Sequence, residues 1–212
     1  MIIFDFFSGT GSSTQAFKDA GHTVVTFELD EQFEATEHAD IFDLNAADLI
    51  AKYGKPDFVW ASPPCTAFSV ASMGHHWLRG GANPLPKTKA AETSQLLVAH
   101  TLKLINDLNP TKGWLMENPR GMLRKLPVVA GIPRVTVTYC QYGDGRMKPT
   151  DLWGVVPNWK PRKPCKNGWP CHEAAPRGSK TGTQGVKGAK DRSKVPYELG
   201  KDLLESTTRG MK

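Results

Sequence analysis

Short apolar runs alternate with amphipathic stretches along the first two thirds of the chain. Runs rich in β-branched and aromatic residues predict strands at residues 2–7, 23–27, 57–61, 113–116, 135–140 and 151–155. Apolar positions at a helical period predict helices at residues 14–20, 89–108 and 197–205, of which the second is the longest. Residues 66–87 contain several glycines and prolines and are predicted to form a loop.

The order of these elements predicts an α/β fold. Residues 2–27 form a strand, a glycine-rich turn, a helix and a second strand, which is a βαβ unit. We therefore expect a mostly parallel, doubly wound sheet that ends in an antiparallel edge hairpin. The composition changes at residue 157, after which Pro, Gly, Lys and Arg dominate. The predicted organisation is a core at 1–156, a basic insertion at 157–194 and a helix at 195–212 that returns to the core.

Composition narrows the class of protein. The chain has 212 residues, of which 39% are hydrophobic and 23% charged, as is usual for a globular domain. No apolar run approaches the roughly 18 residues that a membrane span needs. The first residues carry an early acid and no basic stretch, so we expect a cytoplasmic protein without a membrane partner. The four cysteines are then expected to be thiols, metal ligands or a nucleophile rather than disulfides.

Positive charge is concentrated in the predicted insertion. Residues 160–194 contain ten lysines or arginines and two acids, a local charge of +8, and since the whole chain carries +6 the remainder carries −2. A basic segment on a nearly neutral body favours a polyanionic partner, first of all nucleic acid. The alternative is a solvated basic loop.

The predicted strands end in residues that can carry chemistry. Ligands of open parallel sheets bind beyond the carboxyl ends of the strands, so these residues should meet in one cleft. Gly9 and Gly11 allow a ligand to approach the backbone closely, and Glu28 suits the two hydroxyls of a ribose. The alternative for the two glycines is an ordinary turn between strand and helix.

Cys65 and Glu117 are the reactive residues of this set. Cys65 follows Pro63 and Pro64, which fix the backbone and make a rigid mount for a nucleophile. Alone, the cysteine would be read as a small buried apolar residue. Glu117 is followed by Asn118-Pro119, a stiff pair that can aim the carboxyl group, although the acid would also be compatible with a surface position.

Together these motifs resemble the cytosine-C5 DNA methyltransferases. Asp5-Phe6-Phe7-Ser8-Gly9-Thr10-Gly11 is similar to their motif I, Glu28 to motif II, and Asp40-Ile41 to the adenine-binding aspartate motif. Residues 62–69, with Pro63-Pro64-Cys65, resemble motif IV, and Glu117-Asn118-Pro119 resembles motif VI. Tyr142-Gly143 with Arg146 and Lys148 resembles an altered motif VIII, and residues 194–199 resemble motif X faintly.

The resemblance implies a Rossmann-like methyltransferase fold with S-adenosylmethionine as the cofactor and DNA as the partner. It implies that the cofactor is bound by Asp5, Phe7, Ser8, Gly9, Thr10, Gly11, Glu28, Leu29, Asp40, Ile41 and Pro63. It also implies that the Cys65 thiolate attacks carbon 6 of cytosine while Glu117 acts on ring nitrogen 3 as an acid. We expect a raised pKa for Glu117 and an electropositive surrounding that activates the thiol.

Two features depart from the family pattern. Arg146-Met147-Lys148 replaces a Gln-x-Arg-x-Arg pattern, so either Arg146 or Lys148 could hold the carbonyl oxygen of the base or a nearby phosphate. Residues 154–194 stand where family members carry a substantial recognition domain, as in small phage-like members. Specificity is therefore expected to be short or loose, with affinity that depends mainly on phosphate contacts.

The insertion also contains Cys165, Cys171 and His172, which could supply three zinc ligands. Their spacing is unusual and no fourth ligand is evident, although Cys140 is possible, so we expect free thiols and no metal. Trp159 and Trp169 could stack on bases, but anchoring of the insertion to the core is favoured.

Other functions remain open at this point. A related sulfonium donor could transfer a different group to cytosine. A catalytically idle nucleic-acid-binding protein on this fold would not need the intact Cys65 and Glu117. A nicotinamide-dependent oxidoreductase would share the βαβ start but leave Pro63-Pro64-Cys65 unexplained. A monomer is expected.

Overall fold

A mixed sheet forms the centre of the computed structural model, which describes residues 1–78, 83–174 and 188–209. Within these ranges seven strands have the order β3-β2-β1-β4-β7-β9-β8. Their bounds are β1 (Ile2–Phe6), β2 (Thr23–Glu28), β3 (Glu37–His38), β4 (Phe58–Ala61), β7 (Trp114–Pro119), β8 (Arg134–Thr138) and β9 (Pro149–Val155). The first five in the order are parallel, whereas β9 runs antiparallel to β7 and β8. The predicted parallel sheet with an antiparallel edge hairpin is confirmed.

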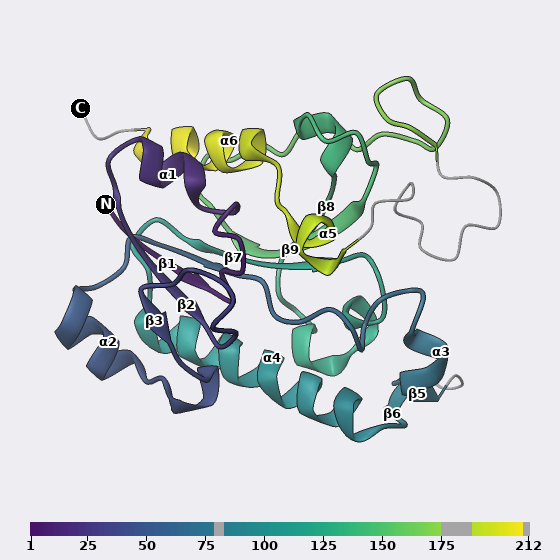
Figure 1. Ribbon diagram of the computed structural model, residues 1–212, viewed down its shortest axis with the longest axis horizontal. Coiled ribbons are helices and arrows are strands. Elements are labelled where there is room, and N and C mark those ends of the chain that lie inside the picture. The colour runs from purple at the N-terminus through teal and green to yellow at the C-terminus, as the bar shows by residue number, and fades with distance from the viewer. Residues whose placement is uncertain (79–82, 175–187, 210–212) are drawn as a thin grey trace.

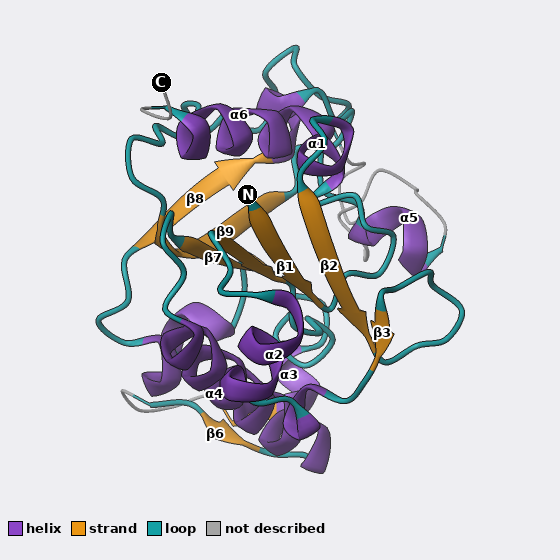
Figure 2. Ribbon diagram, turned by 90° about the vertical axis from the view of Figure 1, so that its left-hand side faces the viewer, coloured by secondary structure: helices purple, strands orange, loops and turns teal. Residues whose placement is uncertain are grey.

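Helices cover both faces of the sheet (Figures 1 and 2). One layer contains α1 (Gln15–Asp19) and α6 (Tyr197–Thr208), and the other contains α2 (Ala46–Tyr53) and α4 (Lys89–Leu108). Successive strand residues point to opposite faces, so Ile3 belongs to the core cluster under α1 and α6 while Phe4 belongs to the one over α4. The continuous apolar runs of the sequence reflect this burial on both faces.

The long helix is found at the predicted residues. Its first turn is capped by Thr88, whose Oγ1 accepts a hydrogen bond from the Ala91 backbone N–H at 3.3 Å. It ends at Asn109, which has a left-handed conformation with φ of 45°. The helix α2 was not predicted, although Asn45 and Asp48 mark its beginning in the sequence.

Residues 66–87 are not only a loop, contrary to the prediction. They include α3 (Met73–His76), β5 (Trp77–Leu78) and β6 (Leu85–Pro86), and residues 79–82, with the loop glycines Gly80 and Gly81, lie outside the described part of the chain. Trp77 is buried, and its Nε1 donates to the Ala67 carbonyl oxygen at 2.7 Å. Elements this short depend on such tertiary contacts, which no local periodicity reveals.

Two strand ends also differ from the prediction. β7 continues through Glu117 and Asn118, which pair with Leu152 and Asp151 of β9. Its pairing with β4 stops earlier, at Met116, so at Glu117 the strand is paired with β9 alone. β8 ends at Thr138, and the expected last strand residues form the 3-10 helix η4 (Tyr139–Tyr142). Three further 3-10 helices are η1 (Ile41–Asp43), η2 (Leu123–Lys125) and η3 (Pro127–Val129).

The segment after β9 lacks a core of its own in its described part. Among residues 157–174 only Cys165 is buried, and α5 (Ala189–Ser193) follows after residues 175–187, which lie outside the described ranges of the predicted insertion. The helix predicted at 197–205 is found as α6, which packs against α1. None of the helices in the described ranges combines the length and apolar character needed to cross a bilayer.

Candidate active site

The glycine-rich turn after β1 has a left-handed backbone. Phe7, Gly9 and Gly11 have φ of 60°, 49° and 67°. A Cβ added at either glycine would have no neighbour within 4 Å, so the conformation rather than crowding requires glycine and leaves open space beside the turn. The Gly9 backbone N–H donates to Oε2 of Glu28 at 2.8 Å, which joins the ends of β1 and β2.

Asp5 lies fully buried at the base of this turn. Its Oδ2 accepts hydrogen bonds from Ser13 Oγ and Thr14 Oγ1, both at 2.7 Å. Its Oδ1 is buried with no hydrogen-bond partner among the described residues, and the same is true of Ser8 Oγ. Burial raises the pKa of Asp5 to about 6. The sequence reasoning missed Ser13 and Thr14, whose only signal is two hydroxyls directly after the turn.

The residues expected at the adenosine end line the adjoining strand ends. The Glu28 carboxylate also accepts from the backbone N–H groups of the next two residues, at 2.9 and 3.1 Å. Leu29 has an exposed fraction of 64%, which is unusual for a leucine and leaves it available to a ligand. The Asp40 side chain caps η1, in which Ile41 is buried.

The loop that carries Cys65 is held from several sides. Asn118 donates from Nδ2 to the Pro63 carbonyl oxygen at 2.9 Å in a buried hydrogen bond, so the two predicted catalytic motifs are in direct contact. After the loop, the Phe68 carbonyl accepts from the Met122 backbone N–H at 2.7 Å. A Cβ on Gly121 would lie 2.2 Å from the same carbonyl oxygen, so this approach requires a glycine.

Glu117 is buried and has a partner that sequence reasoning missed. Its Oε1 accepts a hydrogen bond from the Tyr139 hydroxyl at 3.0 Å. Burial raises the pKa of Glu117, while the charge of Lys148 and the Tyr139 hydrogen bond oppose that increase. The direction agrees with the expectation for an acid. Tyr139 follows β8 directly, and nothing local in the sequence distinguishes it from a core tyrosine.

Charges converge on the Cys65 thiol. Burial raises its pKa, the negative charge of Glu117 raises it further, and the positive charges of Lys148 and Arg192 lower it. The expected positive charges are therefore present, but burial and the charge of Glu117 have the larger effect on the pKa of Cys65. Since ionised Glu117 is one cause of the increase, a proton on Glu117 would favour the thiolate form of Cys65.

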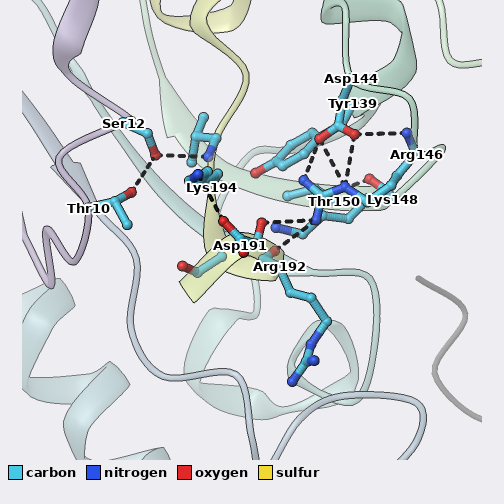
Figure 3. A network of polar contacts seen from close by, with 12 residues as sticks. Thr10, Ser12, Tyr139, Asp144, Arg146, Lys148, Thr150, Asp191, Arg192 and Lys194 are labelled. Atoms are coloured by element: carbon cyan, nitrogen blue, oxygen red, sulfur yellow. Dashed lines mark hydrogen bonds and ion pairs between the residues drawn. The ribbon is translucent and has the colours of Figure 1, made fainter. Parts of the chain in front are cut away.

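Arg146 and Lys148 have different partners in the structure (Figure 3). Arg146 donates from Nε to Asp144 Oδ1 at 2.8 Å and from Nη1 to the Asp191 carbonyl oxygen at 3.2 Å, so it binds its own loop to α5. Lys148 has φ of 28° and places Nζ 4.5 Å from the centroid of the Tyr139 ring. Burial lowers the pKa of Lys148, and the charge of Glu117 opposes this effect.

The segment after α5 closes onto the glycine-rich turn. The Val195 backbone N–H donates to Ser12 Oγ at 3.0 Å, and Thr10 Oγ1 donates to the same oxygen at 3.1 Å (Figure 3). Lys194 forms an ion pair with Asp191 of α5 at 2.9 Å. The residues that faintly resemble motif X therefore lie beside the predicted cofactor turn.

The remaining residues singled out in the sequence lie on the segment after β9. Cys165, Cys171 and His172 approach one another and Cys140. Trp159 is partly buried against the core cluster of α6, whereas Trp169 has an exposed fraction of 39%. Anchoring therefore fits Trp159 alone.

Comparisons with known proteins agree with the motifs. The family model of C-5 cytosine-specific DNA methylases matches residues 1–127. A protein of Frog virus 3 (isolate Goorha), designated "Probable DNA (cytosine-5)-methyltransferase", is 32% identical over 167 residues, which are 76% of this chain and 74% of that protein.

Solved structures support the fold alone. A methyltransferase assigned to DNA modification and encoded within an E. coli prophage superposes with a TM-score of 0.52 at 18% identity, over 79% of this chain and 52% of that one. The Entamoeba histolytica methyltransferase EhMeth gives 0.52 at 13% identity, over 76% of this chain and 55% of that one. The chain thus spans about half the length of these two structures.

Proposed function

The chain belongs to the C-5 cytosine-specific DNA methylases, and from this premise we propose that it transfers a methyl group from S-adenosylmethionine to carbon 5 of cytosine in DNA through a covalent bond to Cys65. One observation carries the proposal. The buried hydrogen bond from Asn118 to the Pro63 carbonyl oxygen joins the strand of Glu117 to the loop of Cys65. The charge of Glu117 raises the pKa of the Cys65 thiol, and the charge of Lys148 lowers it. A partly buried nucleophile and a partly buried cation near a buried acid fit covalent attack on a base.

The cofactor residues fit a ligand with a charged amine and a ribose. The unpartnered Oδ1 of Asp5 and Oγ of Ser8 are buried polar atoms of the kind that a ligand satisfies. Gly9 and Gly11 leave open space next to them, while Glu28, Leu29 and Asp40 would hold the nucleoside end. When bound, S-adenosylmethionine supplies an electrophilic methyl group.

Cys65 and Glu117 divide the chemistry on the base. The thiol of Cys65 loses its proton to solvent and Sγ bonds to carbon 6. The electrons of the 5,6 double bond move to the 4,5 position, those of the 3,4 double bond move to nitrogen 3, and nitrogen 3 accepts a proton from Glu117. Carbon 5, now nucleophilic, gains the methyl group. Loss of the carbon 5 proton to solvent reforms the 5,6 double bond and expels Sγ, and nitrogen 3 returns its proton to Glu117.

Tyr139 and Lys148 support these steps. The Tyr139 hydroxyl fixes Oε1 of Glu117, which leaves the other carboxyl oxygen for the base. Lys148, rather than Arg146, takes the role next to the base carbonyl oxygen, because the Arg146 guanidinium is committed to Asp144 and α5. Such a site cannot reach a cytosine inside a duplex, so the target is flipped out or single-stranded.

The basic segment at 157–194 contributes affinity more than sequence reading. It carries an excess of eight positive charges, and phosphate contacts position DNA without reading its bases. Recognition is therefore short or loose. Binding should weaken steeply between about 50 and 200 mM salt, and binding that is insensitive to salt would contradict this role.

Trapping on a modified substrate tests the covalent step. We would incubate the protein with S-adenosylmethionine and DNA that contains 5-fluorocytosine, in which carbon 5 has no proton to lose. Wild type should form an adduct that survives denaturation, and Cys65→Ala should not. An adduct with both proteins, or with neither while cytosine is still methylated, would overturn the role of Cys65. Mass spectrometry of the product nucleosides identifies the transferred group and separates methyl from a group of a related sulfonium donor.

A further inference from the structure

Three thiols and one imidazole meet outside the candidate active site. Cys140 lies in η4 on the core, whereas Cys165, Cys171 and His172 lie on the segment after β9. One potential ligand atom from each of the four lies within 4.8 Å of all the others. From this convergence we propose that these residues form a structural zinc site that attaches the basic segment to the catalytic core.

Three of the distances between the ligand atoms lie close to the values of a tetrahedral zinc site. Zinc bonds of about 2.3 Å to sulfur and about 2.0 Å to nitrogen place two sulfurs roughly 3.8 Å apart, and a sulfur and a nitrogen roughly 3.5 Å apart. Cys171 Sγ lies 3.7 Å from Cys140 Sγ and 3.6 Å from His172 Nδ1, and Cys165 Sγ lies 3.7 Å from that nitrogen. The 3.1 Å between the sulfurs of Cys140 and Cys165 is short for this geometry, and the two remaining pairs of ligand atoms lie within 4.8 Å.

The donor set selects the metal and the kind of site. Three cysteines and one histidine are a ligand set of structural zinc sites, in which soft thiolates favour zinc over magnesium or calcium. All four positions come from the protein, so no position remains for a substrate or a reactive water. The sulfurs of Cys140 and Cys165 are also too far apart for a disulfide, whose sulfurs are bonded at about 2.05 Å.

The surrounding contacts fit ligands rather than ordinary core cysteines. Gln141 directs its Nε2 at Cys171 Sγ from 3.2 Å, as a donor that favours a thiolate. The Cys165 backbone N–H donates to Thr138 Oγ1 at 2.9 Å, which fixes the ligand to the end of β8. Cys165 is also the single buried residue among the described residues 157–174. A segment with so little apolar burial needs another source of stability, and a bound metal ion supplies one.

The site has a consequence for the candidate active site. Cys140 follows Tyr139 directly, and the Tyr139 hydroxyl bonds to Glu117. A metal on Cys140 would hold η4 and the basic segment in one arrangement. The ion would therefore act as a positioning element for Glu117 and for the lysines of the basic segment, without contact with the reacting atoms.

Metal analysis of the 212-residue chain tests the proposal without reference to methyl transfer. Protein purified under reducing conditions without added zinc should contain one zinc per chain by mass spectrometry. Loss of an outer partner of a metal ligand weakens binding roughly 10- to 100-fold, so loss of a ligand in Cys171→Ser or His172→Ala should weaken zinc binding by at least about 100-fold. Cys65→Ala is the matched control and should keep its zinc, because Cys65 is the one cysteine outside the cluster.

Two further measurements cover variants that do not fold. His172→Cys replaces one zinc ligand by another and should fold with one zinc bound, which a packing role for the imidazole would not produce. Cobalt added to the chelator-treated wild-type chain should give the thiolate charge-transfer and tetrahedral d–d bands. Zinc below one tenth of an equivalent together with no cobalt bands, equal zinc in Cys171→Ser and wild type, or a disulfide in the freshly purified chain would each overturn the proposal.

Discussion

The sheet and the segment that follows it are held in place by different interactions. In the sheet, Phe4, Val59 and Trp60 are completely buried, and two core clusters cover its two faces. In residues 157–174 one residue is buried and Trp159 packs partly against the core, while Arg162 donates from Nε to Asp202 Oδ2 of α6 at 2.8 Å. Hydrophobic burial thus stabilises the sheet, which holds Cys65 and Glu117. Ion pairs and the contacts of the thiols hold the segment that carries the positive charge.

This difference suggests a division of roles. Residues of the core should control the rate of methyl transfer and the stability of the fold. Residues of the basic segment should control DNA affinity with little effect on either. Each of the following changes tests that separation, from the largest expected effect to the smallest.

Glu117→Gln should affect the rate but not DNA binding. Loss of an acid catalyst costs about 10²- to 10⁴-fold, so the single-turnover rate should fall within that range while the Kd for DNA stays the same. Burial raises the pKa of Glu117, so the wild-type rate should decline as the pH rises through that raised pKa, and the variant should lack this decline. Glu173→Gln, an exposed acid in the segment, is the control. A variant that keeps the wild-type rate would remove Glu117 from the mechanism.

Two tryptophan substitutions compare how much each region contributes to the free energy of unfolding. Trp153 on β9 is 1% exposed, whereas Trp169 is 39% exposed. Trp153→Ala should lower the free energy of unfolding by about 3–5 kcal/mol because it leaves a cavity in the core. Trp169→Ala should change it by no more than about 0.5 kcal/mol. Urea denaturation measures both, and similar losses would show that the segment has a core after all.

Asp5 should make the stability of the core depend on pH. Its folded-state pKa of about 6 lies above the ordinary 3.8, so protonated Asp5 contributes stability that is lost as the pH rises between these values. The difference between the two pKa values corresponds to roughly 3 kcal/mol in the free energy of unfolding. The free energy of unfolding should therefore be compared for wild type and Asp5→Asn between pH 3.5 and 7. The part of its decline with rising pH that comes from Asp5 should be present in wild type alone.

The matched control for this experiment lies in the segment. Asp191 is an exposed acid whose pKa is lowered by Lys194. Asp191→Asn should therefore leave the decline of stability with rising pH in place. If Asp5→Asn showed the same decline as wild type, the buried carboxyl group would not be its cause.

Lysines of the segment should affect only the binding of DNA. Lys163 and Lys166 are exposed, and each phosphate contact contributes about 0.9 to the slope of log K against log salt. The double variant Lys163→Ala, Lys166→Ala should lower this slope by up to about 2 while the rate at saturating DNA stays unchanged. Lys55→Ala removes an exposed lysine just before β4, at the opposite end of that strand from Cys65. If the slope fell equally in Lys55→Ala, the net charge of the protein rather than the position of the lysines would set the salt dependence of binding.

The sequence alone determined the frame of this protein. Its apolar runs and helical periods predicted the parallel strands and the helix at 89–108, because burial on both faces leaves a direct trace in the pattern. The turn at Gly9 and Gly11, the loop at Cys65 and the acid at Glu117 were found because each stands at or near the end of a predicted strand. The cofactor, the chemistry and the loose specificity remain proposals that rest on this frame.

Tertiary structure decided which groups act on one another. Tyr139 and Glu117 are joined only through the pairing of β7, β9 and β8, and the contacts of Arg146 with α5 are the reason for proposing Lys148 as the group near the base. Cys140 became the fourth member of the thiol cluster in the same way, across 25 residues from Cys165. The physical reason is that local patterns record whether a residue is buried, whereas its partners depend on strand register and on where a distant segment returns.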